Sequence, residues 1–245
     1  MLLVAGLSSP GFSQTDADVG WTVSTTTSVK PERREEFEAS LKQVMEAYKE
    51  AGTPWFFTLQ NLAGDTTEYT TVVPVKRFGD LDGPPLMARV LGERGWRKLA
   101  RKLGRCYTTE TRQFSLRQPD LEINRVDVPL GGYWLETRTL VTQDRMDDYL
   151  RWLKDDYLPA LRASRVAHFL VSRPVFGGPG GEVIQSRMLR SLAEIDGGPV
   201  LAKALGETEA RAANARSAPL VRSSTTRIVL MRTDLSYSTA RPPDN

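Results

Sequence analysis

The stretch "DGGPVLAKALGE" (196–207) nearly repeats "DGPPLMARVLGE" (82–93), with identity at 7 of 12 positions when the chain is shifted by 114 residues against itself. The agreement continues downstream, where "RQPDL" (117–121) aligns with "MRTDL" (231–235). A period of about 113 residues is far longer than the unit of a solenoid repeat. The sequence therefore predicts a duplicated domain.

Each half predicts the order strand, helix, strand, strand, helix, strand. In the first half the predicted strands are 20–28, 54–60, 68–75 and 107–117, which are rich in Thr, Val and aromatic residues. The first helix starts at Pro31 and stops at Gly52, and the second is N-capped by Asp82 and begun by Pro84 and Pro85. This order is that of the ferredoxin-like split βαββαβ unit.

Such a unit packs both helices on one face of a four-stranded antiparallel sheet, so the other face needs a cover. We expect the two sheets of this α+β chain to face each other in an intrachain α/β barrel with the helices outside. We also expect a monomer, because one duplicated chain is equivalent to a dimer of single units. The expected segments are a tail at 1–19, a first repeat at 20–123, a linker at 124–132, a second repeat at 133–237 and a tail at 238–245.

Composition excludes several classes of protein and of site. The 245 residues are 40% hydrophobic and 26% charged, which is typical of a soluble globular protein. Lys and Arg total 33 and Asp and Glu total 30, and because this excess is small we expect no nucleic-acid partner. A single Cys excludes an internal disulfide, and one Cys with one His excludes the usual zinc sites. Phosphate-loop, dinucleotide and nucleophile-elbow motifs are absent from the sequence, as are transmembrane runs.

The first residues resemble the end of a secretory signal. "MLLVAGLSSPGFSQ" (1–14) has a short apolar run and a small-x-small triplet, Gly11-Phe12-Ser13, which a signal peptidase could accept. It lacks a basic n-region, so we interpret it as a truncated signal peptide and expect a secreted or periplasmic protein. The alternative is a disordered tail on a cytoplasmic protein.

Three residues of the strand after the linker are candidates for a site. Strand alternation places Trp134, Glu136 and Arg138 on one face. If this face lines the barrel, Arg138 could hold an anionic or carbonyl group, Glu136 could accept a proton, and Trp134 could form an aromatic wall. The alternative is a structural ion pair between Glu136 and Arg138.

His168, the only histidine, falls on the second strand of the second half, where the first half has Phe56. It could do acid–base work or act as an axial ligand of haem iron. The alternative is an ordinary half-buried histidine. Cys106 has no adjacent His and is interpreted as a small core residue.

A basic stretch, "RGWRKLARKLGR" (94–105), would form a continuous cationic stripe on a helix. The stripe consists of Arg94, Arg97, Lys98, Arg101, Lys102 and Arg105. It could bind an anionic membrane surface, polysaccharide or nucleic acid. The alternative is the solvated side of a helix packed on a sheet.

The segment "YWLETRTLVTQDRMDDYLRWLKDDYLPALR" (133–162) resembles the opening of NIPSNAP-type domains of the dimeric α/β-barrel superfamily. That superfamily includes antibiotic-biosynthesis-type monooxygenases, dye-decolourising haem peroxidases and chlorite dismutases. Its haem-binding members take their axial His from a helical region, so the strand position of His168 argues against haem, and we expect no cofactor.

The resemblance implies a small organic ligand between the two sheets and two alternative functions. One is a cofactor-independent monooxygenase or isomerase in which Glu136, Arg138 or His168 moves a proton. The other is a non-catalytic interaction protein with a filled barrel and a basic helix that meets an anionic partner. A ligand pocket should reach roughly 300 Å³.

Overall fold

The computed structural model describes residues 20–125, 128 and 130–239. The signal segment at 1–19 and most of the C-terminal tail lie outside the described residues. The first half contains β1 (Trp21–Val29), α1 (Arg34–Glu50), β2 (Trp55–Asn61), β3 (Glu68–Pro74), α2 (Leu86–Gly104) and β4 (Tyr107–Arg117). The second contains β6 (Tyr133–Val141), α3 (Met146–Trp152), α4 (Leu158–Ala163), β7 (His168–Phe176), β8 (Glu182–Leu189), α5 (Ala193–Asp196), α6 (Val200–Leu205), α7 (Glu207–Ser217) and β9 (Val221–Met231).

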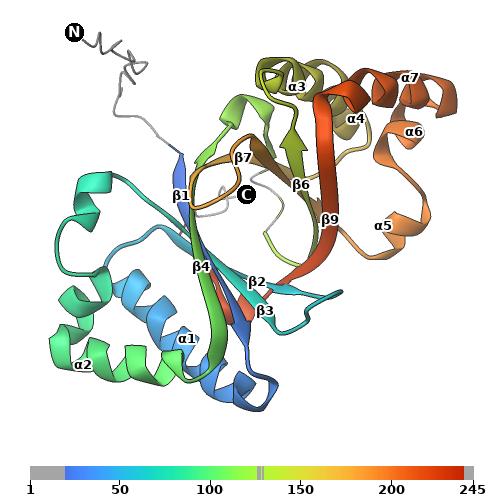
Figure 1. The fold of residues 1–245 in the computed structure, drawn as a ribbon. Coiled ribbons are helices and arrows are strands. Elements are labelled where there is room, and N and C mark those ends of the chain that lie inside the picture. Colours follow the sequence, from blue (N-terminus) through green and yellow to red (C-terminus); the bar gives the residue numbers. More distant parts are fainter. Residues whose placement is uncertain (1–19, 126–127, 129, 240–245) are drawn as a thin grey trace, which may run out of the picture.

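Eight long antiparallel strands form a closed ring. Strands β2, β3, β1 and β4 are adjacent in that order, and β7, β8, β6 and β9 repeat the same order in the second half. The ring closes because β4 pairs with β7 and β2 pairs with β9. The helices lie outside it, α1 and α2 against the first half and α3, α4, α6 and α7 against the second (Figure 1).

Each half extends a short strand onto the other. Strand β5 (Ile123–Asn124) pairs with β7, and β10 (Tyr237–Ser238) pairs with β2. The predicted linker therefore begins with a paired residue, Asn124, and so does the predicted tail, with Ser238. Each pairing connects a half to the first residues of the other half's second strand.

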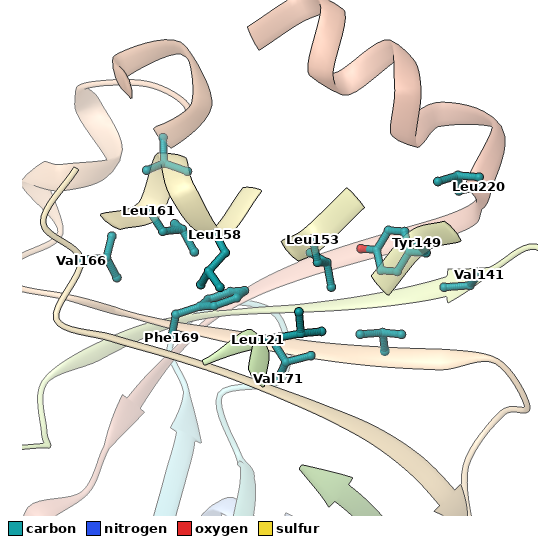
Figure 2. Close-up of a cluster of buried hydrophobic side chains, with 12 residues drawn as sticks. Leu121, Val141, Tyr149, Leu153, Leu158, Leu161, Val166, Phe169, Val171 and Leu220 are labelled. Carbon is teal, nitrogen blue, oxygen red and sulfur yellow. The ribbon is translucent and has the colours of Figure 1, made fainter. Parts of the chain in front are cut away.

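Two apolar layers lie between the helices and the ring. In the second half, Leu153 of the π-helical turn after α3 (Leu153–Tyr157) and Leu158 and Leu161 of α4 pack over Phe169 and Val171 of β7 (Figure 2). Burying one such side chain contributes roughly 1.5–3 kcal/mol. Phe37, Phe56 and Tyr69 occupy the matching layer in the first half, where Cys106 is also fully buried, as expected.

The repeated stretch places a glycine with the same backbone conformation in both halves. Gly92 has φ 69° and ψ 156°, and Gly206 has φ 82° and ψ 164°. Both lie in a backbone region that is essentially restricted to glycine. Each glycine ends one helical segment and starts another, so a glycine is required at the same place in both halves.

Two sequence-based expectations about the second helices were wrong. Asp82 does not cap α2, since it ends a 3-10 turn (Phe78–Leu81), while the helix begins at Leu86 after an extended Pro85. A residue before proline is kept out of the helical region, so Pro84 and Pro85 disfavour helical backbone at Gly83 and Pro84 and delay the start. In the second half the expected single helix is three short ones, α5 to α7.

Candidate functional site

Strand β6 directs its predicted site residues into the ring. The hydroxyl of Tyr149 on α3 donates a hydrogen bond to Thr139 Oγ1 at 3.2 Å, which fixes the Thr139 side of β6 as the helix-facing side. Alternation then turns Trp134, Glu136 and Arg138 to the interior. The prediction that these three residues share one face is confirmed.

One end of the ring interior is filled with apolar side chains. Trp134 packs there with Met188, Val229 and Met231, and Val128 and Leu130 from the segment between the halves pack against this cluster. The indole Nε1 of Trp134 donates to the carbonyl of Gly131 at 3.1 Å. Trp134 is therefore part of a packed core.

His168 lies at this apolar end, away from the charged residues of the interior. Its Nε2 donates to the carbonyl oxygen of Val128 at 2.8 Å, and its Nδ1 is 2.9 Å from Asn124 Oδ1. The imidazole also stacks on Trp134, with ring centroids 6.2 Å apart. Because both ring nitrogens have hydrogen-bond partners in the chain, His168 does not fit the role of an axial haem ligand.

The other end of the interior holds a network of charged side chains centred on Glu136. Glu136 Oε1 accepts hydrogen bonds from Arg138 Nε at 2.9 Å and from Arg227 Nε at 2.9 Å. Arg227 also bonds to Glu68, and Arg138 Nη1 lies 3.4 Å from Glu182 Oε2. The ion pair expected between Glu136 and Arg138 exists and is part of a larger network.

Two amides extend this network at its ends. Gln113 Nε2 donates to Glu182 Oε2 at 3.2 Å, and Asn61 Nδ2 donates to Glu68 Oε1 at 3.1 Å. Burial acts to lower the pKa of Arg138, but the charges of Glu136 and Glu182 outweigh it and raise that pKa above its ordinary value. Arg138 is thus a fixed cation and cannot transfer a proton near neutral pH.

A cavity of about 200 Å³ opens beside this network. It is lined by Ser24, Thr26, Glu68, Thr111, Gln113, Arg138, Gly177 and Arg227. Glu136 and Glu182 bond to the lining arginine side chains without being part of the wall themselves. The arrangement presents two guanidinium groups, one carboxylate, an amide and three hydroxyls to a bound molecule.

The glycine-rich loop between β7 and β8 forms one edge of the cavity. A Cβ atom on Gly177 would lie 2.2 Å from the carbonyl oxygen of Arg112, and the residue has φ +79°. A Cβ atom on Gly178 would lie 2.0 Å from Gln113 Nε2. These glycines let the loop rest directly on β4.

Sequence reasoning missed Glu68, Gln113, Glu182 and Arg227. The available signal was alternation on the other strands, because Arg227 lies opposite Glu136 in the β6–β9 register. Because β-sheet propensity alone explains threonine in a strand, a Thr-rich composition does not by itself mark a cavity wall. The same alternation places Thr26 and Thr111 beside each other on the cavity wall.

The basic stripe lies on the outside of the molecule. Five of its six residues are exposed, Lys102 is half-buried, and Arg105 follows the last residue of α2. Arg97 Nη2 is 3.5 Å from Glu93, one turn earlier. The stripe is thus available to a partner and separate from the cavity.

A larger depression, of about 450 Å³, lies outside the ring. It lies between the 3-10 turn after β4 (Pro119–Leu121) and the helices that follow β6, and Leu121, Leu150 and Lys154 are among its lining residues.

No helix within the described ranges is long and apolar enough to cross a bilayer. No group of three or more potential metal ligands occurs within these ranges either.

Comparison with solved structures identifies the fold. No known family's sequence model matches the chain, and no curated protein sequence matches it significantly. A candidate monooxygenase from Lactobacillus acidophilus is 9% identical, with 91% of this chain and 97% of that chain covered and a TM-score of 0.64. An anthrone oxidase-like protein is 15% identical, with 94% and 97% covered and a TM-score of 0.64.

A variant chlorite dismutase from Candidatus Nitrospira defluvii, in complex with cyanide, is 13% identical, with 88% and 92% covered and a TM-score of 0.52. These proteins belong to the dimeric α/β-barrel superfamily, and this chain has that α+β fold. Similarity at such low identity shows the fold alone. Because one fold supports many chemistries, the function of this chain depends on its site.

Proposed function

We propose that this protein binds a small polar organic molecule at the charged end of its barrel. The cavity beside the network is the observation that supports this function. Its walls combine fixed charges with hydroxyl and amide groups, which are suited to hydrogen-bond a polar compound. Glu136 holds the two guanidinium groups in place, since its Oε1 accepts from both.

The size and polarity of the cavity restrict the ligand. At about 200 Å³ it is below the roughly 300 Å³ of ordinary ligand pockets, so the bound molecule must be small. The apolar end of the ring is filled by Trp134 and its neighbours. A polycyclic aromatic compound, such as the anthrone in the name of one structural neighbour, does not match the polar lining of this cavity.

A cofactor-independent monooxygenase or isomerase is the catalytic form of this proposal, and the likeness to candidate monooxygenases favours it. Among the described residues, Glu68 is the only carboxylate on the cavity wall. Glu68 is thus the group that would accept a proton from a substrate. Glu136 and Arg138 would position the substrate, and His168 would support the apolar core.

Native mass spectrometry against a panel of small hydroxylated, carbonyl and amine compounds tests the proposal. We expect the wild-type protein to retain at least one compound and Thr26→Leu, which fills the cavity with an apolar side chain, to lose it. Thr208→Leu, at an exposed position of α7, is the matched control and should bind normally. Retention by Thr26→Leu, or no bound compound at all, would contradict the proposal.

A second candidate function is docking of α2 on an anionic surface, which the exposed stripe favours. Vesicles of phosphatidylcholine with phosphatidylserine should bind the protein more strongly than phosphatidylcholine alone, and added salt should weaken that binding. Binding that does not respond to salt would refute this candidate. Arg97→Ser with Arg101→Ser should reduce the binding.

The proposal also covers the evolutionary origin and the location of the protein. We propose that the two halves arose by tandem duplication of a ferredoxin-like unit, on the basis of their shared strand order and the equivalent Gly92 and Gly206. Residues 133–162 support a NIPSNAP-like origin. A secreted or periplasmic location and a monomeric state complete the proposal.

A further inference from the structure

We infer that the cavity selects a small organic cation, an ammonium that also carries a hydroxyl or carbonyl group. This inference rests on the proposed function, since it specifies the charge of the ligand that the cavity would bind. It follows from the balance of charge in the network.

The network contains more carboxylates than guanidinium groups. Arg138 and Arg227 contribute +2, while Glu68, Glu136 and Glu182 contribute −3, so the net charge is −1. Glu136 is almost wholly buried, and Glu182 is buried too. An uncompensated charge in such a place is poorly solvated, and a ligand of opposite charge relieves it.

The neighbouring side chains do not supply the missing positive charge. The other groups on the cavity wall are hydroxyls, an amide and a glycine, all neutral. Arg112 is the nearest further cation along β4, next to the inward Gln113, and its side chain is largely exposed and pairs with Glu110 at 3.6 Å. Alternation directs it to the outside of the ring. Within the described residues, the excess negative charge therefore faces the cavity.

The geometry favours an ammonium over a metal ion. Among the residues that the structure describes, Glu68 is the single carboxylate on the wall, whereas Ca²⁺ takes six to eight oxygen ligands and Mg²⁺ needs an octahedron of them. The other two carboxylates lie behind the wall and accept hydrogen bonds from Arg138. An ammonium needs only a few acceptors, which Glu68 and the hydroxyls of Ser24 and Thr26 provide.

The same balance disfavours an anion. A carboxylate ligand would make the local charge more negative, from −1 to −2, although Arg138 and Arg227 line the wall. Each of these guanidinium groups is already bonded to two carboxylates. The arginines therefore act mainly as internal counter-ions, which differs from the anion-holding role that the sequence suggested for Arg138.

Three probes of similar size and different charge test this inference: 2-aminoethanol, ethylene glycol and glycolate. Their binding is followed by chemical-shift changes of the amides of Ser24, Thr111 and Gln113. We expect 2-aminoethanol to bind at least about tenfold more tightly than the other two, corresponding to about 1.4 kcal/mol.

Two variants remove the excess charge in different ways. Glu68→Gln removes the carboxylate on the wall, and Glu182→Gln removes one behind it that does not touch the ligand. Both should abolish the preference for 2-aminoethanol, and melting curves show that each variant is folded. Glu93→Gln on α2 is the matched control and should keep the preference.

The outcomes separate this inference from the function on which it rests. If ethylene glycol or glycolate shifts the same amides with equal or greater affinity, the cavity remains a binding site and the cation selectivity is refuted. If the preference survives in both Glu68→Gln and Glu182→Gln, the charge argument is also refuted. If none of the three probes shifts these amides, both proposals fail.

Discussion

Replacement of Glu136 by Gln is the sharpest perturbation of the charged network. The Glu136 residue is only 4% exposed, and its Oε1 lies 2.9 Å from Arg138 Nε and 2.8 Å from Arg227 Nη2. Gln keeps the size of the side chain and removes its charge. Two guanidinium groups with 27% and 19% of their side chains exposed would then lose their shared counter-ion.

The expected cost follows from these contacts. Removing one partner of a buried ion pair costs about 3–5 kcal/mol. The cost here is smaller, about 1.5–3 kcal/mol, which is the contribution of hydrogen bonds to a charged group, because Arg138 keeps Glu182 and Arg227 keeps Glu68. In a protein of this size each kcal/mol lowers Tm by roughly 2–4 °C, so Glu136→Gln should melt about 3–12 °C below the wild type.

Urea denaturation followed by circular dichroism measures this free energy of unfolding. Glu36→Gln is the control, because the Arg33–Glu36 pair on α1 has side chains 51% and 31% exposed. Such surface pairs contribute about 0–1 kcal/mol. If Glu136→Gln were no less stable than Glu36→Gln, the network would not be the buried, coupled structure described above.

Three further substitutions test how single residues contribute to the stability of the protein. Gly177→Ala should lower the free energy of unfolding by about 2 kcal/mol or more, because its Cβ would meet the Arg112 carbonyl at positive φ. His168→Phe should cost about 1–3 kcal/mol, since it removes both buried hydrogen bonds of the ring, and should leave cavity binding unchanged. The hydrogen bond from Arg232 lowers the pKa of Glu38 below 4.5, although burial opposes it. The Glu38 carboxylate therefore contributes stability above that pH which is lost as the pH falls through the lowered value, and Glu38→Gln should flatten this acid dependence.

Each of these predictions is checked by a control variant or by a result that would contradict it. Gly180→Ala has open space around it and an ordinary φ, so it should be neutral where Gly177→Ala is not. Weaker binding of a cavity ligand by His168→Phe would show that the two ends of the ring are coupled. If the free energies of unfolding of Glu38→Gln and wild type differed by a constant amount from about pH 6 to about pH 3, the Glu38–Arg232 contribution would be excluded.

Most of the architecture could be predicted because its determinants are local. The β4 boundaries, 107–117, were predicted correctly, and the hairpin of β2 and β3 was predicted to within one residue at each end. Alternating Thr and Val positions and glycine stops determine these elements within a few residues. The failure at Asp82 came from a competing local effect, the proline pair that follows it.

The candidate site could be predicted only on one strand. Glu136 and Arg138 are two residues apart in the sequence, so alternation alone shows that they share a face. Arg227 and Glu68 reach the same place from β9 and β3, which are far away along the chain. Their proximity depends on how the ring closes, because β9 meets β2 only in the tertiary structure. A search for charged residues at the inward positions of all eight strands would have found them.

A crystallographic screen of small polar compounds tests the central claim most directly. We predict electron density for at least one compound in the cavity between Glu68 and Arg138, with the side chains of Glu136 and Arg227 in the arrangement described here. Compounds found only elsewhere on the molecule, or a ring interior closed by its own side chains, would contradict the claim that the charged end of the barrel is a binding site.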